Sequence, residues 1–103
     1  MIYELERTDE FNKWLKRLKD RQAVLAITKR LTRIAVGNFG DSKSVGGEVF
    51  ELCFFVGPGY RVYYTFHGEK IIFLLCGGDK STQSKDIEKA KHLAKDLKEG
   101  NLI

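Results

Sequence analysis

The residues best suited to chemistry lie in the segment 48–83, and Arg61 is the most informative of them. It is a lone cation in the aromatic run Tyr60–Tyr64. Because successive strand residues face opposite sides, Arg61 shares a face with Tyr63, whereas Val62 belongs to an apolar face. The planar guanidinium group of arginine can contact two oxygens of one phosphate. We therefore expect function on the face that carries Arg61, with an anion as the ligand.

A carboxylate lies on the strand that precedes Arg61. Alternation places Glu51 on one face together with Val49 and Cys53, and Leu52 on the other. An acid among apolar neighbours either pairs with a cation or takes part in function. Two interpretations of Glu51 and Arg61 stay open. They form a functional pair, or they form a partly buried salt bridge that sets the register of two strands.

This part of the chain predicts three antiparallel strands. Apolar and aromatic residues at 48–55, 60–66 and 70–76 are separated by the short turns GPG and HGE, which indicates two hairpins. A polar loop, GGDKST, leaves the last strand and carries Lys80. We expect this loop to lie beside Arg61.

Apolar residues at helical spacing predict two helices ahead of these strands. Thr8 or Asp9 can cap the first helix. Asp20 can cap the second, which ends near Gly37. The two helices are expected to form an αα-hairpin whose apolar stripes cover the sheet.

Three further segments complete the predicted fold. Alternation at 2–6 indicates a first strand, and the glycine- and serine-containing segment 38–47 is expected to be a loop. Helical spacing after residue 84 predicts a last helix that ends at Gly100. The predicted fold class is α+β, with an N-terminal strand, a helical hairpin, a three-stranded antiparallel meander and a C-terminal helix.

Length and composition limit the kind of protein. We expect the 103 residues to form one domain over 1–103, which has room for a core but not for a large enclosed cavity. The chain starts without a basic segment followed by an apolar one, and its longest apolar run is too short to span a membrane. We expect a cytoplasmic protein that makes no membrane contact.

The two cysteines indicate neither a disulfide framework nor a metal site. Cys53 and Cys76 fall within apolar strand segments, and no C-x-x-C or Cys/His ligand spacing occurs. We expect reduced core thiols, no bound metal and no cofactor.

Positive charge is concentrated in the predicted helical hairpin. Eight basic residues and a single acidic one lie between Phe11 and Arg33, a local charge of +7, whereas the whole chain has a net charge of +4. Lys13, Arg17 and Arg30 belong to this block. Such a block suits a polyanion, either nucleic acid or an acidic protein segment. The alternative is that these residues are only the solvated faces of helices.

Two motifs resemble those of a known family. The stretch GPGYRVYY, and GGDKSTQ followed by KDI, are similar to the signature of the HigB-like addiction module killer protein branch of the RelE/ParE toxin superfamily. The likeness covers nearly the whole chain. It implies the toxin of a type II toxin–antitoxin system whose partner is a helix-turn-helix antitoxin, with a toxin–antitoxin heterotetramer as one assembly.

The resemblance also implies two alternative activities. Some relatives enter the ribosomal A site and cut messenger RNA without a metal, and others with the same fold inhibit DNA gyrase. Our first expectation is a ribosome-dependent mRNA endoribonuclease, with the ribosome and mRNA as partners. The alternative is a non-enzymatic inhibitor of gyrase or of another protein target, because a fold does not determine a function.

The resemblance assigns roles to individual residues. Arg61 matches the family's phosphate-binding arginine and is expected to stabilise the transition state, with Lys80 as a second cation. Glu51, across the sheet from Arg61, is expected to act as the base. Tyr63 is expected to stack on a base or to donate a proton. Four cations outside the matching motifs are further candidates for RNA contacts. They are Lys43, whose alternative is a solvated loop lysine, and Lys13, Arg17 and Arg30 of the basic block.

The sequence departs from the family pattern on the strand before Arg61. The lysines that RelE carries there are replaced by Leu52 and Phe54, and many members have an arginine where this chain has Cys53. A missing cation near the phosphate site weakens the nuclease hypothesis, or makes this protein a poor catalyst.

Overall fold

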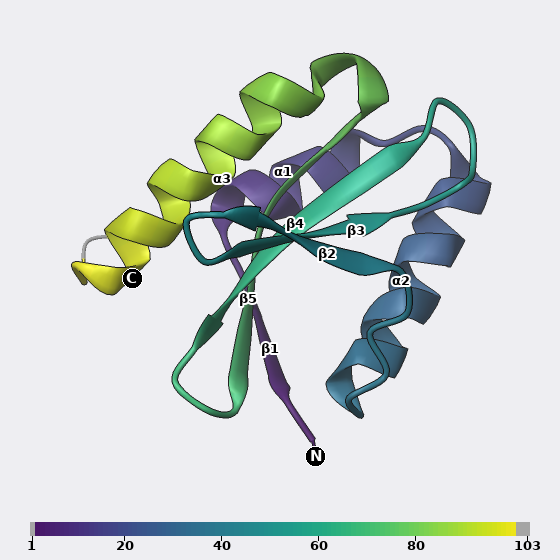
Figure 1. Cartoon of the computed structure of the whole chain (residues 1–103). Helices are drawn as coiled ribbons and strands as arrows, with labels where there is room; N and C mark the ends of the chain where they lie inside the picture. Colours follow the sequence, from purple (N-terminus) through teal and green to yellow (C-terminus); the bar gives the residue numbers. More distant parts are fainter. Residues whose placement is uncertain (1, 101–103) are drawn as a thin grey trace.

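The computed structural model describes residues 2–100, in which helices cover both faces of a five-stranded sheet (Figure 1). The strand order is β1-β5-β4-β3-β2, with β1 parallel to β5 and the other neighbours antiparallel. The elements are β1 (Glu4–Arg7), α1 (Asp9–Arg17), α2 (Arg21–Ala35), β2 (Ser42–Gly46), β3 (Val49–Cys53), β4 (Tyr60–His67), β5 (Ile71–Asp79), the 3-10 helix η1 (Lys80–Thr82) and α3 (Gln83–Lys98). The predicted α+β class is confirmed. No helix in this part of the chain is long and apolar enough to cross a membrane.

The predicted meander is present as β3, β4 and β5. Cys53 lies opposite Arg61 on the β3 side, and Gly78 lies opposite Arg61 on the β5 side. The register of β4 and β5 shifts between Tyr63 and Tyr64, which marks a β-bulge. Arg61 therefore sits on a central strand with backbone partners on both sides.

The segment 38–47, predicted as a loop, contains strand β2. Ser44 pairs with Phe50, and Lys43 pairs with Glu51. The prediction of a loop is wrong. The strand was missed because β2 lies at the edge of the sheet. Its backbone pairs on one side only, so polar residues that face solvent are tolerated and the sequence shows little apolar alternation. The consequence for the site is that β2 brings Lys43 beside Glu51.

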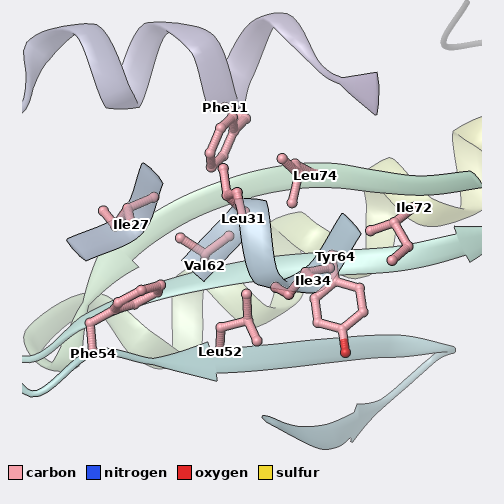
Figure 2. Close-up of a cluster of buried hydrophobic side chains, with 10 residues drawn as sticks. All are labelled: Phe11, Ile27, Leu31, Ile34, Leu52, Phe54, Val62, Tyr64, Ile72 and Leu74. Atoms are coloured by element: carbon pink, nitrogen blue, oxygen red, sulfur yellow. The ribbon is translucent and has the colours of Figure 1, made fainter. Parts of the chain in front are cut away.

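Side chains cap both N-terminal helices as predicted. Thr8 Oγ1 accepts a hydrogen bond from the Phe11 amide at 3.0 Å, and Asp20 Oδ1 accepts one from the Ala23 amide at 3.1 Å. Caps of this kind each stabilise a helix by about 1 kcal/mol. The two helices contribute to one buried cluster on the same face of the sheet, drawn in Figure 2: Phe11, Ile27, Leu31, Ile34, Leu52, Phe54, Val62, Tyr64, Ile72 and Leu74.

The C-terminal helix α3 covers the opposite face of the sheet (Figure 1). Its alanine-rich stripe was predicted, and it packs against strands in a second buried cluster: Val49, Tyr63, Leu75, Cys76, Ala90 and Ala94. The face that carries Arg61 is therefore not wholly polar. It is apolar along most of α3 and polar near the first turn of this helix.

Both cysteines have free thiols, as predicted. Cys76 is buried beneath α3, and burial raises the pKa of its thiol to about 12. Cys53 is half-buried at the end of β3, and burial also raises the pKa of its thiol. At neutral pH both groups are protonated thiols, so neither is an activated nucleophile.

Candidate functional site

Polar residues from three strands and the first turn of α3 meet around Glu51. Lys43 on β2 and Tyr63 on β4 are its direct cross-strand neighbours. Sequence reasoning placed Glu51 across from Arg61, but the register puts Cys53 opposite Arg61. The Glu51–Arg61 contact is therefore diagonal, with 3.8 Å between Oε1 and Nε.

The carboxylate of Glu51 is fully buried and surrounded by donors. Oε2 accepts hydrogen bonds from the Tyr63 hydroxyl at 2.9 Å and from Gln83 Nε2 at 2.8 Å. Oε1 accepts a weaker one from the Cys53 thiol at 3.5 Å and lies 3.6 Å from Lys43 Nζ. Burial raises the pKa of Glu51, but these hydrogen bonds and the lysine charge outweigh burial, so the pKa is lowered. Glu51 is consequently an ionised anchor at neutral pH.

The lowered pKa of Glu51 predicts a loss of stability in acid. A carboxylate whose pKa is lower in the folded protein stabilises the fold above its unfolded value of 4.5, and this contribution is lost as the pH falls through the folded pKa. We expect the free energy of unfolding in urea to fall less between about pH 5 and pH 3 in Glu51→Gln than in the parent protein. Glu88→Gln, at an exposed glutamate on α3, is the matched control. An unchanged profile in Glu51→Gln would contradict this account.

The guanidinium group of Arg61 is largely buried and only partly satisfied. Its side chain is 13% exposed. Nη1 donates to the carbonyl oxygens of Gly59 at 3.2 Å and of Tyr60 at 3.5 Å. Nε is buried and has no hydrogen-bond partner within residues 2–100, where its nearest charge is that of Glu51. Buried donors without an acceptor are uncommon. The Arg61 side chain is thus held between the Gly59 and Tyr60 carbonyls and the Glu51 carboxylate, with a buried Nε that lies near this carboxylate without a hydrogen bond.

Lys80 lies close to Arg61, and Gly59 separates the two. A Cβ atom on Gly59 would lie 3.5 Å from Arg61 Nη1 and 3.7 Å from Lys80 Cβ. Gly59 has a φ of +83°, so this turn favours glycine for its backbone as well. Asp79 starts η1 by accepting a hydrogen bond from the Ser81 amide at 2.8 Å. The loop that leaves β5 therefore places the backbone end of an exposed Lys80 side chain on the opposite side of Gly59 from the Arg61 guanidinium.

Arg30, one of the cations expected to bind RNA, is engaged within the fold. Its Nε, Nη1 and Nη2 donate to the carbonyl oxygens of Phe39 at 3.2 Å, Cys53 at 3.1 Å and Asp41 at 2.7 Å. Its guanidinium carbon also lies 5.1 Å from the centre of the Phe54 ring. These contacts tie α2 to the end of β3, so Arg30 has a structural function in this conformation.

The other residues expected to bind RNA lie in different places. Tyr63 is fully buried and its hydroxyl is bonded to Glu51, so its ring is not available to stack on a base. Lys43 is exposed and points its ammonium group toward Glu51. Lys13 and Arg17 line a cavity between α1, β5 and α3. The structure thus brings Lys43 and Tyr63 into the Glu51 cluster and leaves the two helix cations elsewhere.

Sequence reasoning missed two residues from the first turns of α3. Gln83 bonds directly to Glu51. Asp86 is buried, and Thr82 Oγ1 donates to its Oδ2 at 2.6 Å. A Cβ atom on Gly78 would overlap the Asp86 carboxylate, so Asp86 lies against the residue that pairs with Arg61. The signal in the sequence was a glycine at the end of an apolar strand, which often marks a close approach.

Two solved structures share the fold. A free-state mutant of the E. coli toxin RelE, in which two arginines are replaced by alanine, matches with a TM-score of 0.72 and 20% identity over 87% of this chain and 95% of that one. A chain of the intact E. coli RelBE toxin–antitoxin complex matches with a TM-score of 0.61 and 18% identity, over 75% of this chain and 95% of that one. These matches define the class of fold, and the chain has the fold of the toxin RelE.

The family is defined by sequence. Residues 13–99 match the family described as phage derived protein Gp49-like (DUF891), and the chain belongs to this family. An uncharacterized protein of Haemophilus influenzae (strain ATCC 51907 / DSM 11121 / KW20 / Rd) is 47% identical over 97 residues, which cover 94% of this chain and 98% of the relative.

Proposed function

We propose that this protein is the toxin of a type II toxin–antitoxin module and that it cuts ribosome-bound messenger RNA. The observation that carries the proposal is the position of two cationic residues around Gly59, where Arg61 lies 3.8 Å from Glu51 and the Cβ atom of Lys80 lies on the other side of the glycine. Two adjacent cations suit a phosphodiester. The pair occurs on a fold shared with the toxin RelE.

The proposed reaction uses charge stabilisation by Arg61 and Lys80. The 2′-hydroxyl of a ribose gives its proton to solvent as its oxygen forms a bond to the neighbouring phosphorus. The bond from phosphorus to the 5′-oxygen breaks, and the 5′-oxygen takes a proton from solvent, which leaves a 2′,3′-cyclic phosphate. Negative charge increases on the non-bridging oxygens as the phosphorus becomes pentacoordinate. Arg61 donates to these oxygens through its planar fork, and Lys80 neutralises charge on the departing oxygen. Because the Arg61 side chain is only slightly exposed, its attraction to the phosphate oxygens is stronger than it would be in water.

We assign Glu51 a positioning role in place of the base role expected from sequence. A general base must reach the proton that it removes. The carboxylate of Glu51 is fully buried, holds the Tyr63 hydroxyl and the Gln83 amide, and has a lowered pKa. These properties favour a fixed negative charge that orients the Arg61 guanidinium.

The proposal includes a protein antitoxin as partner. RelBE is a toxin–antitoxin complex, and one of its chains shares this fold. In the nuclease proposal the basic block between Phe11 and Arg33 contacts ribosomal RNA, whereas in an inhibitor of a protein target the same surface mainly receives an acidic or mixed segment of the antitoxin. A helix-turn-helix antitoxin and a heterotetrameric complex are part of the same hypothesis.

One observation favours the second candidate function, a non-enzymatic inhibitor of gyrase or another protein. Glu51 and Tyr63, the two residues expected to move protons, are both fully buried and bonded to each other. A toxin that only binds its target needs no accessible base. In this case the cationic surface would serve recognition alone.

Mapping of transcript ends after induction of the protein in bacteria separates the two functions. The nuclease proposal predicts new 5′ ends inside translated codons within minutes of induction, with chromosomal DNA intact. Gyrase inhibition predicts double-strand DNA breaks while transcripts stay whole. Induction that leaves transcripts uncut would overturn the nuclease proposal.

A further inference from the structure

We propose that the cavity between α1, β5 and α3 binds a phosphate of the RNA backbone, as a subsite separate from Arg61. The inference rests on the proposed function, because it specifies where the substrate strand runs. The cavity has a volume of about 270 Å³, and a water molecule occupies about 30 Å³, so a phosphodiester group fits. Its lining is mainly polar and includes Lys13, Arg17, Lys89, Glu10, Trp14 and Gly77.

The cavity exists because β1 is shorter than β5. Their pairing ends with Arg7 opposite Leu74, so the outer edge of β5 has no strand partner at Gly77. Helices α1 and α3 flank this open edge and contribute the cations. A Cβ atom on Gly77 would overlap the Trp14 ring, so glycine allows this ring to form a wall of the cavity directly against the backbone.

The charge of the cavity favours an anion. Three cations and one acid line it, a local charge of +2. Lys13 and Arg17 are one helical turn apart on the same face of α1, and neither forms an ion pair within residues 2–100. Lys89 Nζ is 3.5 Å from Glu10 Oε2, and both side chains are about half exposed. A phosphate entering the cavity competes with Glu10 for the lysine.

The position of the cavity connects it to the proposed cleavage site. Gly77 precedes Gly78, which pairs with Arg61 on the adjacent strand. A nucleic-acid strand that presents one phosphate to Arg61 can therefore present a nearby phosphate at the edge of β5. A mainly polar lining favours a phosphate over the apolar side chains of an acidic amphipathic peptide.

The test uses two substitutions that break the same ion pair. The probe is a fluorescein-labelled 2′-O-methyl oligouridine decamer, which carries the phosphate backbone but has no 2′-hydroxyl and cannot be cleaved. We expect Lys89→Gln to weaken binding about two- to fivefold, as for loss of one exposed charge contact, and Glu10→Gln to strengthen binding. The slope of log K against log salt should decrease in magnitude by about 0.7 in Lys89→Gln. Both variants lose the same ion pair. If Lys89 and Glu10 had only a structural role, the two substitutions would therefore change the affinity for the probe in the same direction.

Lys95→Gln, on the same helix but not lining this cavity, is the control for net charge. Equal weakening by Lys95→Gln and Lys89→Gln, or shifts of the same sign for Lys89→Gln and Glu10→Gln, would overturn the proposal. Absence of probe binding at low salt would also overturn the proposal. A decaglutamate peptide that binds as tightly as the probe, and depends in the same way on Lys89 and Glu10, would instead assign the cavity to an acidic protein segment. Because the probe cannot be cleaved, binding with the expected pattern supports the subsite even if transcript mapping disproves the nuclease.

Discussion

Replacement of Arg61 by alanine is expected to abolish toxicity and transcript cleavage while the protein still folds and binds its antitoxin. Loss of one preorganised donor to a developing oxyanion lowers a rate by about 10²- to 10³-fold. The fold is expected to survive because Glu51 keeps its hydrogen bonds from Tyr63 and Gln83 and its contact with Lys43. The measurement is the frequency of new transcript ends after induction, compared with the parent protein at equal expression.

Two further variants make the Arg61 result interpretable. Arg61→Lys keeps a positive charge but lacks the planar fork, so we expect partial activity and a native circular dichroism spectrum. Lys70→Ala removes an exposed cation from the turn between β4 and β5, outside the basic block, and should leave cleavage unchanged. Full cleavage by a folded Arg61→Ala protein would exclude Arg61 from the reaction. An unfolded Arg61→Lys protein would show that the residue is mainly structural.

Glu51→Ala is expected to cause the largest loss of stability of any substitution in this site. It removes the acceptor of Tyr63 and Gln83 and the counter-charge of a mostly buried Arg61. Removal of one partner of a buried charge pair costs about 3–5 kcal/mol in the free energy of unfolding. For a domain of this size each kcal/mol lowers Tm by about 4–8 °C. Urea titration at neutral pH measures the loss directly.

A matched glutamate separates this effect from a general effect of charge. Glu88 is exposed on α3, and Glu88→Ala should change the free energy of unfolding by less than about 0.5 kcal/mol. The loss in Glu51→Gln should lie between the two, because an amide oxygen still accepts hydrogen bonds but the negative charge near Arg61 is gone. A loss below about 1 kcal/mol in Glu51→Ala would show that Glu51 does not anchor the cluster.

Local patterns in the sequence were sufficient for most of the elements. Thr8 and Asp20 cap the helices that they were predicted to cap, because a cap depends on residues within one turn. Alternation along β4 placed Arg61 and Tyr63 on one face, because this depends only on strand geometry. Strand β2 was missed for the opposite reason. Its pairing with β3 is a tertiary contact that leaves no apolar pattern at an edge.

The sequence by itself determined which residues carry charge and which face of a strand they occupy. It identified Arg61, Glu51 and Lys80 as the residues of interest because a cation or an acid in an apolar strand, or in the loop after it, is conspicuous in composition alone. Only the tertiary structure decided what these residues contact. The register placed Tyr63 opposite Glu51, and the first turn of α3 brought Gln83 to the same carboxylate. Burial and hydrogen bonding set the pKa of a carboxylate, and both depend on residues that are far apart in the chain. The sequence predicted Glu51 as a general base, and only the fold showed that it is a buried, ionised residue that positions Arg61.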